Sequence, residues 1–194
     1  MPYDAMSDRS DEDLLTAYAA GEPAAARALT LRLAPRAFAQ AMRMLRDRAE
    51  AEDVAQEALV RLWRAAPGWR TGEAQVTTWL YRVVSNLCID RIRRRRGGTV
   101  DIAAVDEPPD PAPGVERAML DDARADALET ALEALPERQK QAVVLRHLEG
   151  LSNPEIAAIM DIGVRAVESL TARGRKALEG LLAGKRAELG YDED

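Results

Sequence analysis

VTTWLYRVVSNLCIDRIRRRR, residues 76–96, is the stretch that decides the fold. Its apolar side chains recur every three or four residues, at Val76, Trp79, Leu80, Val83, Val84 and Leu87. Because an α-helix turns once in about 3.6 residues, this spacing places them along one face of a helix. The opposite face carries polar and charged residues, namely Thr78, Arg82, Asn86, Asp90 and Arg93. The sequence therefore predicts an amphipathic helix whose polar face is either solvated or in contact with an external anion.

The length and composition indicate a helical protein of one domain or two small ones. Of the 194 residues, 47% are hydrophobic but only 4% are aromatic, which favours an Ala/Leu-rich helical chain over a β protein. The single cysteine, Cys88, excludes an intramolecular disulfide. Its place next to the apolar position Leu87 favours a packed side chain over a nucleophile.

The sequence carries no signal of catalysis, metal binding or membrane insertion. It has no GxSxG, P-loop or HExxH motif and no CxxC or Cys/His cluster, so we expect no catalytic residue, metal or cofactor. The one histidine, His147, falls at a helix end, where a structural role is favoured. The N-terminus does not read as a signal peptide, and no window of 18 residues is uninterruptedly apolar. We expect a cytoplasmic protein that is not an enzyme.

The formal net charge of −6 conceals a segregation of charge along the chain. Residues 41–96 carry 12 Lys/Arg against 7 Asp/Glu, and residues 136–186 carry 9 against 6. Between these blocks, residues 97–135 carry 2 Lys/Arg against 10 Asp/Glu. Because local potential governs the approach of DNA more than net charge does, the two basic blocks are compatible with nucleic-acid binding.

The acidic block begins with a predicted linker. GGTVDIAAVDEPPDPAPG, residues 97–114, contains four prolines, three glycines and four acidic residues. Such a composition buries little apolar surface, and proline restricts the backbone. We expect this linker to separate an N-terminal domain, residues 1–96, from a C-terminal domain, residues 115–186, which an acidic tail follows at 187–194.

The N-terminal domain reads as a bundle of helices without strand-like alternation. Helices are predicted over residues 10–20, 23–45, 48–63 and 76–96. A loop at residues 67–72 contains one proline and two glycines, which break the helical pattern. The third helix exposes an acidic ridge made of Glu50, Asp53, Gln56 and Glu57.

The C-terminal domain contains the pattern of a helix-turn-helix. Two helices are predicted first, over residues 115–135 and 136–148. Ser152 and Glu155 then form a capping box that opens a short helix with Ile156, Ala157 and Met160 on its buried side. After a turn at residues 161–163, a longer helix starts at Val164 and presents outward Arg165, Glu168, Ser169, Ala172, Arg173 and Lys176. Because a major groove admits one helix, we expect this face to bind DNA; the alternative is an αα-hairpin with a solvated face.

These blocks together resemble the bacterial extracytoplasmic-function (ECF) sigma factors, the two-domain promoter-specificity subunits of RNA polymerase. The matching stretches of the family's region 2 are EDVAQE (52–57), Trp63, TWLYRV (78–83), Asn86, Asp90 and Arg93 to Arg96. Those of region 4 are LPERQ (135–139), EGLS (149–152), EIA (155–157) and residues 167–178. The resemblance covers all of the chain except the termini and the linker. It implies an all-α protein of two small helical domains that recognises and melts promoters.

The resemblance also implies partners and roles for particular residues. Core RNA polymerase, through its β′ and β subunits, and promoter DNA are the expected partners, and an anti-sigma factor is the expected inhibitor. Asp53, Gln56 and Glu57 would dock on the β′ coiled coil. The −10 element would meet Trp69, Arg70, Arg82, Asn86, Arg91, Arg93 and Arg94, with arginines 93–96 neutralising phosphates. The −35 element would meet Arg165, Glu168, Ser169, Arg173 and Lys176.

Three features leave alternatives open. Glu168 and Leu170 stand where the family usually has Lys or Arg, so the −35 contacts are expected to differ from the family pattern. Trp69, expected to stack on an unpaired base, is alternatively a core tryptophan. The stretch GLSNPEIA, residues 150–157, also looks like the helix-turn-helix of LuxR-type regulators, which act as dimers without polymerase. Those regulators usually add an α/β domain, and residues 1–96 show no βα alternation.

Overall fold

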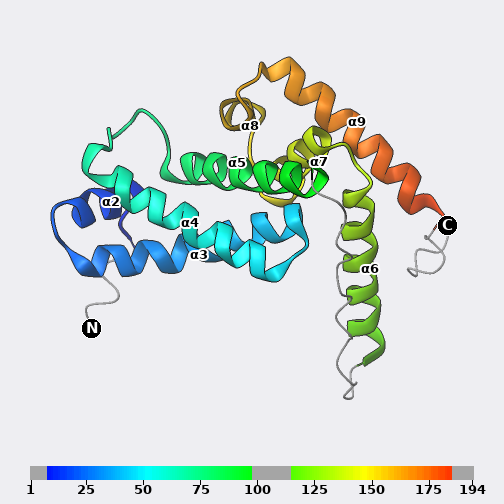
Figure 1. Ribbon diagram of the computed structural model, residues 1–194, viewed down its shortest axis with the longest axis horizontal. Helices are drawn as coiled ribbons and strands as arrows, with labels where there is room; N and C mark the ends of the chain where they lie inside the picture. Colours follow the sequence, from blue (N-terminus) through cyan, green and yellow to red (C-terminus); the bar gives the residue numbers. More distant parts are fainter. Residues whose placement is uncertain (1–7, 98–114, 185–194) are drawn as a thin grey trace.

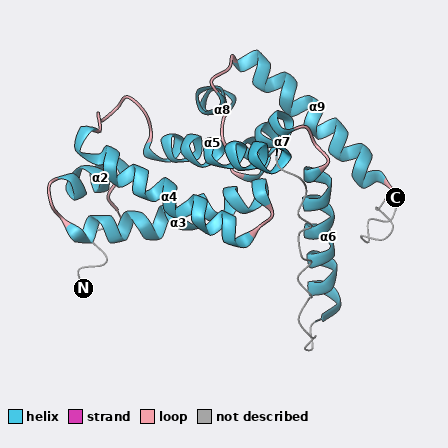
Figure 2. Ribbon diagram, viewed as in Figure 1, coloured by secondary structure: helices cyan, strands magenta, loops and turns pink. Residues whose placement is uncertain are grey.

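The structure is a computed structural model that describes residues 8–97 and 115–184, with side chains over 8–95 and 123–184. Within these ranges every regular element is helical and no strand occurs (Figure 2), which confirms the all-α prediction. The expected linker beyond Gly97 and the expected acidic tail at 187–194 lie outside the described residues.

The N-terminal unit, residues 8–97, is a helical bundle (Figure 1). Its elements are α2 (Asp11–Ala19), α3 (Pro23–Leu45), α4 (Arg48–Ala65), the 3₁₀ turn η1 (Ala66–Gly68) and α5 (Val76–Gly97). Helices α3, α4 and α5 run alongside one another and contact each other pairwise. Every predicted helix is present, and its ends agree with the prediction to within two residues.

Helix α5 has the predicted amphipathic character. Its stripe residues Val76, Leu80 and Val84 are buried, whereas the other three, Trp79, Val83 and Leu87, are half-buried against the same core. Cys88 is fully buried, and its burial raises the pKa of its thiol to about 12. The cysteine is therefore an inert packed side chain at neutral pH, as the sequence indicated.

The turn between α3 and α4 is fixed by its own residues. Arg46 has φ 53° and ψ 32°, a left-handed conformation that ends α3. Asp47 then caps α4 by accepting a hydrogen bond from the Glu50 amide at 2.9 Å. This turn places two carboxylates, Asp47 and Glu50, next to the end of α5.

The C-terminal unit, residues 115–184, consists of α6 (Val115–Glu133), α7 (Glu137–Val143), η2 (Val144–Leu148), α8 (Asn153–Met160) and α9 (Val164–Ala183). The sequence predicted one α-helix over residues 136–148, but the structure widens its last turn into the π-helical η2. There the Glu149 amide bonds back five residues to the Val144 carbonyl at 3.0 Å. Glu149 follows directly and faces the N-terminal unit.

The helix-turn-helix of α8 and α9 forms as predicted. Ser152 and Glu155 make the capping box, and Asp161 takes the left-handed conformation, with φ 53° and ψ 53°, that turns the chain toward α9. Ala157, predicted on the buried side of α8, is only half-buried. Ile159 is buried instead, because the i, i+3, i+4 spacing from Ile156 selects residues 159 and 160.

The two units pack against each other. Helix α8 lies across α5, and η2 contacts α3 (Figure 1). One hydrophobic cluster continues from the N-terminal bundle into the C-terminal unit, which contributes Ala131, Leu132, Leu135, Val143, Val144 and Leu178.

Candidate polymerase and nucleic-acid interface

The acidic ridge of α4 is a continuous exposed strip. Asp53 and Gln56 are exposed, and Glu57 is half-buried and ion-paired with Arg61 at 2.8 Å. Glu50, the fourth expected member, turns away from the ridge and pairs with Arg95 at 2.9 Å. The three residues expected to bind polymerase therefore lie together, one helical turn apart or less.

An apolar groove lies beside this ridge and was not predicted from the sequence. It has a volume of 390 Å³ between α3 and α4 and is lined by Thr30, Leu31, Ala34, Pro35, Phe38, Arg48 and Glu52. Leu31 is 52% exposed there, the most exposed large apolar side chain among the described residues. The sequence gives only a weak signal of this groove, because a leucine that is exposed on a helix cannot be told from a core leucine by its spacing.

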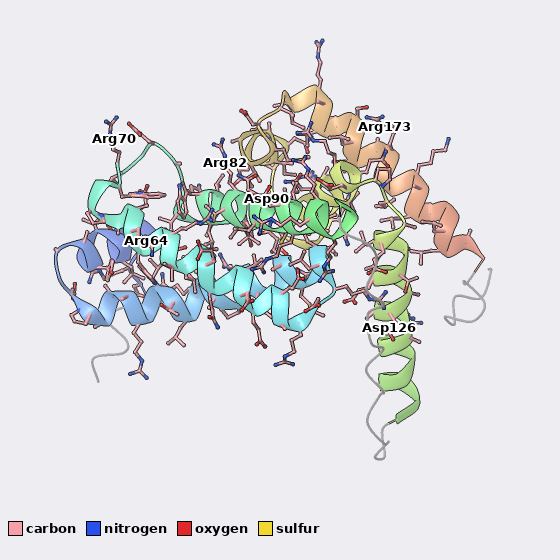
Figure 3. All side chains as sticks on the ribbon, in the orientation of Figure 1. Arg64, Arg70, Arg82, Asp90, Asp126 and Arg173 are labelled. Atoms are coloured by element: carbon pink, nitrogen blue, oxygen red, sulfur yellow. The ribbon has the colours of Figure 1, made fainter. Side chains whose placement is uncertain are left out.

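The loop before α5 carries Trp69 and Arg70, two of the residues expected to bind the −10 element. Trp69 is half-buried and packs edge-on against Trp79, with ring centroids 6.0 Å apart. Its indole Nε1 is buried and meets no acceptor within the described part of the chain. Arg70 extends into solvent (Figure 3) and pairs with Glu73 at 3.2 Å.

The polar face of α5 looks toward the C-terminal unit. Arg82, Asn86 and Asp90 are exposed on it, and Figure 3 shows Arg82 and Asp90 along the helix. A polar cavity of 320 Å³ separates this face from α7 and α8, and its lining is Asn86, Ile89, Asp90, Arg93, Glu137, Arg138, Gln141 and Met160. Asn86 and Trp69 do not meet, because Asn86 is two turns, about 10 Å, beyond the Trp79 position that Trp69 contacts.

The arginines at the end of α5 fall into two groups. Arg91 donates to the Glu50 carbonyl oxygen, and Arg95 pairs with Asp47 at 3.2 Å and with Glu50. These two arginines brace α5 against the α3–α4 turn. Arg82 and Arg94 are exposed and pair with no carboxylate of the described residues, and Arg93 makes only a long 3.7 Å contact with Glu137. The side chain of Arg96 lies outside the described range.

Polar contacts between the units centre on Glu149, which the sequence did not single out for this role. Its side chain is 7% exposed, pairs with Arg43 of α3 and accepts a hydrogen bond from Tyr81 Oη of α5 at 2.8 Å. Burial, followed by the Glu149 charge, raises the pKa of Tyr81 well above its ordinary value, so the phenol stays protonated.

A second polar contact involves a buried lysine. Lys140 of α7 is 7% exposed and donates from Nζ to the Met44 carbonyl oxygen at 2.9 Å, which caps the end of α3. Burial lowers the pKa of Lys140. Arg46 adds surface pairs with Glu129 at 3.5 Å and Glu133 at 3.2 Å.

The outer face of α9 is exposed over its length. All five residues expected to meet the −35 element, Arg165, Glu168, Ser169, Arg173 and Lys176, are exposed on it. The Arg173 Nε atom donates to the Ser169 carbonyl oxygen at 3.2 Å, so its stem lies along the helix (Figure 3).

Other site types find little support in the parts of the chain that the structure describes. They contain no group of His, Cys, Asp or Glu that could hold a metal ion. None of the described helices is both long enough and apolar enough to cross a membrane.

Known proteins resemble this chain in the same two units. The family model for sigma-70 region 2 matches residues 29–97, and the model for sigma-70 region 4 matches residues 125–178. Among solved structures, CnrH in complex with the cytosolic domain of CnrY aligns with a TM-score of 0.67 at 26% identity, over 91% of this chain and 99% of that one. The sigma factor RpoE of Bartonella quintana, in complex with the anti-sigma factor NepR, shares the fold, with a TM-score of 0.62 at 22% identity over 79% and 94% of the two chains.

Curated relatives extend the match beyond single domains. The chain is 32% identical over 192 residues to the RNA polymerase sigma-H factor of Pseudomonas aeruginosa, covering 91% of this chain and 96% of that protein. It is 33% identical to the ECF sigma factor SigM of Mycobacterium tuberculosis, covering 90% and 86%. It is 34% identical to the ECF sigma factor SigE of Mycolicibacterium smegmatis over 80% of this chain, but spans only 60% of that relative's length. Because identities above 30% run through both units of nearly full-length relatives, the chain belongs to the ECF RNA polymerase sigma factors.

Proposed function

We propose that this ECF sigma factor directs transcription initiation through three separate surfaces. The α4 ridge binds core RNA polymerase, the polar face of α5 binds the −10 element, and the outer face of α9 binds the −35 element. The observation that carries this assignment is the division of charge among exposed faces. The α4 ridge presents carboxylates that suit a basic partner protein, whereas the polar face of α5 and the outer face of α9 expose arginines that suit DNA phosphates.

The polymerase surface combines charge with an apolar contact. Asp53 and Glu57 supply negative charge for a basic partner, and Leu31 with its adjoining groove supplies apolar area for the same partner to cover. The proposal is tested by titrating labelled chain with core polymerase. We expect Asp53→Asn with Glu57→Gln to weaken binding about tenfold or more, and Asp126→Asn, which removes one exposed negative charge from α6, to leave it unaltered. Equal affinity for all three proteins would remove the ridge from the interface.

The −10 surface of α5 lies beside the C-terminal unit. In the arrangement described here Asn86 is exposed but shares the polar cavity with Glu137 and Gln141 of α7, so movement of the C-terminal unit away from α5 would give an unpaired base more room. Trp69 would stack on such a base only after the loop before α5 has moved, because its ring is now half-buried against Trp79. Arg82 and Arg94 would then meet the neighbouring phosphates, making binding sensitive to salt.

Promoter melting tests this assignment. Asn86→Ala should reduce the permanganate reactivity of unpaired thymines in the −10 region while leaving core binding intact. A template with the −10 region already mismatched should restore transcription, because such DNA needs no opening. If the mismatched template gives no rescue, or if core binding falls, Asn86 has a structural role instead.

Control by an anti-sigma factor is part of the same proposal. Two structural relatives were solved in complexes, RpoE of Bartonella quintana with NepR and CnrH with CnrY. A partner that holds the two units together would keep α7 and α8 beside Asn86. We further propose that the chain acts in the cytoplasm, where the polymerase works, and that the polymerase performs all the chemistry.

The LuxR-like alternative is not retained, because the region 2 match occupies the N-terminal unit and no strand occurs in its described residues.

A further inference from the structure

Helix α9 is held at one rotational setting by its contact with α7. A methyl group added at Gly174 would lie 2.6 Å from Val143 Cγ2 and 3.3 Å from the Gln139 carbonyl oxygen. The helices therefore approach as closely as glycine permits, and Val167 and Leu178 are buried on the same side. Rotation of α9 would force these contacts apart, so the residues that face outward are fixed.

The outward face follows from this setting. Residues at i, i+1, i+4, i+5, i+8 and i+9 lie on one side of a helix, and from Val164 these are Val164, Arg165, Glu168, Ser169, Ala172 and Arg173. All six are exposed. Leu170 is half-buried in the cluster around Val167, so it packs between α8 and α9 and does not read DNA. Glu168 sits at the centre of the outward face.

Glu168 is anomalous for a surface that approaches a polyanion. It is the only acidic residue from 164 to 176, and its neighbours on the face include two arginines. Its carboxylate makes no ion pair within the described residues, although Arg165 is only three positions away. A carboxylate repels phosphates, so its favourable contacts with DNA are confined to groups that donate hydrogen bonds.

Base edges differ in the donors that they present in the major groove. Cytosine offers its N4 amino group, whereas guanine offers only acceptors and thymine offers an acceptor and a methyl group. Adenine offers an N6 donor, but its N7 acceptor lies beside it and opposes the second carboxylate oxygen. We infer that Glu168 is a specificity residue that selects cytosine at one position of the −35 element. This inference rests on the proposed function of α9 and goes beyond it, because it names the base.

A conservative change at Glu168 should change the base that the helix prefers. Glutamine keeps the shape of the side chain but offers one donor and one acceptor, the pair that adenine N6 and N7 complement. Glu168→Gln should therefore move the preference from cytosine to adenine at the same position, without altering the other positions. Good and poor bases at that position should differ in affinity by roughly 5- to 150-fold.

The experiment is a selection with the whole holoenzyme. Core polymerase carrying the full chain selects bound fragments from duplex DNA randomised upstream of the start site, and the enriched sequences are compared among variants. The wild type and Asp126→Asn, a matched charge change on α6, should both enrich cytosine at the position that Glu168→Gln changes to adenine. Circular dichroism confirms that the variants keep their helices.

Three outcomes would overturn the inference, and they differ in what else they affect. If Glu168→Gln selects the same base as the wild type, Glu168 reads no base while the proposed function stands. If Glu168→Gln raises affinity for all sequences equally, Glu168 acts only through phosphate repulsion. If the wild-type chain binds core polymerase but enriches no upstream sequence, the −35 role of α9 falls together with this inference.

Discussion

Glu149 should hold the two units together, and its removal gives the sharpest test of the observed arrangement. The carboxylate joins Arg43 and Tyr81 of the N-terminal unit from its place after η2. Glu149→Ala would leave the Tyr81 hydroxyl without its acceptor in a residue that is 5% exposed. We therefore expect the equilibrium to shift from the closed arrangement toward one in which the units are apart.

The size of the shift follows from the two contacts. Leaving a buried hydroxyl without a partner costs about 1–3 kcal/mol. The Arg43 side chain is 32% exposed, so solvent screens the ion pair and its loss adds at most about 1 kcal/mol. Together the loss is about 1–4 kcal/mol, which shifts a two-state equilibrium roughly 5- to 1,000-fold.

Energy transfer between dyes measures the separation of the units. Ala19 on α2 and Ala183 at the end of α9 are exposed and suit cysteine substitution. Cys88 will not compete for the dyes near neutral pH, because burial raises the pKa of its thiol to about 12. Glu149→Ala should lower the transfer efficiency, and Glu179→Ala, which breaks the surface pair with Arg175 inside the C-terminal unit, should not.

A double-mutant cycle identifies the contact responsible. Tyr81→Phe removes only the hydroxyl that Glu149 accepts from, so both variants lose the same hydrogen bond. The change in transfer efficiency of the double variant should therefore be smaller than the sum of the two single changes. If both single variants give the wild-type transfer efficiency, the reasoning is refuted, because the Glu149 contacts then contribute nothing to closure. Strictly additive effects would refute the direct hydrogen bond.

Three further predictions concern stability. Gly174→Ala should lower the free energy of unfolding by about 1–3 kcal/mol, because the added methyl group clashes with Val143. Gly180→Ala lies on the same helix, but its added methyl group meets nothing within 4 Å, so it should raise the free energy of unfolding by up to about 1 kcal/mol. Urea unfolding of both variants measures the contrast. Ser152→Ala should cost about 1 kcal/mol through loss of the α8 cap, and an unchanged unfolding midpoint would contradict the capping role. Hydrogen bonds from Ser152 lower the pKa of Glu155 below its ordinary value of 4.5. The ionised carboxylate therefore contributes its full stabilisation of the fold above that pH, and this stabilisation is lost as pH falls through the lower folded-state pKa. In thermal melts from pH 6 to pH 3, the melting temperature of Ser152→Ala should fall less than that of the wild type.

Local structure was predictable because local chemistry determines it. The capping box at Ser152 and Glu155 and the 3.6-residue spacing of α5 depend on residues that are close in sequence, and the structure reproduces both. The π-helical turn η2 was not predictable, because residues 144–148 have ordinary helical side chains. Its widening is visible only in the backbone hydrogen bonds.

The exposure of the candidate site residues was partly predictable, and their contacts were less so. Charge patterning placed Asp53, Gln56 and the α9 face correctly on the surface. The family resemblance also assigned Arg91 and Arg95 to promoter DNA, whereas in the structure both arginines contact the α3–α4 turn. These contacts depend on Arg46 ending α3 in a left-handed conformation, which brings Asp47 and Glu50 to the end of a helix some forty residues later in the chain.

The contact between the units contains buried polar side chains beside its apolar cluster, and these affect the cost of separation. Lys140 is the clearest case, because a lysine among apolar side chains loses its hydration, and its lowered pKa reflects that loss. Its one hydrogen bond to Met44 restores part of the loss while the units stay closed. When they part, water can solvate both the ammonium group and the carbonyl, and the same holds for Glu149, Arg43 and Tyr81. Apolar residues at these positions would lose stability on exposure without such compensation. Polar side chains at these positions therefore lower the cost of separating the units, and separation would open the space beside the −10 surface of α5.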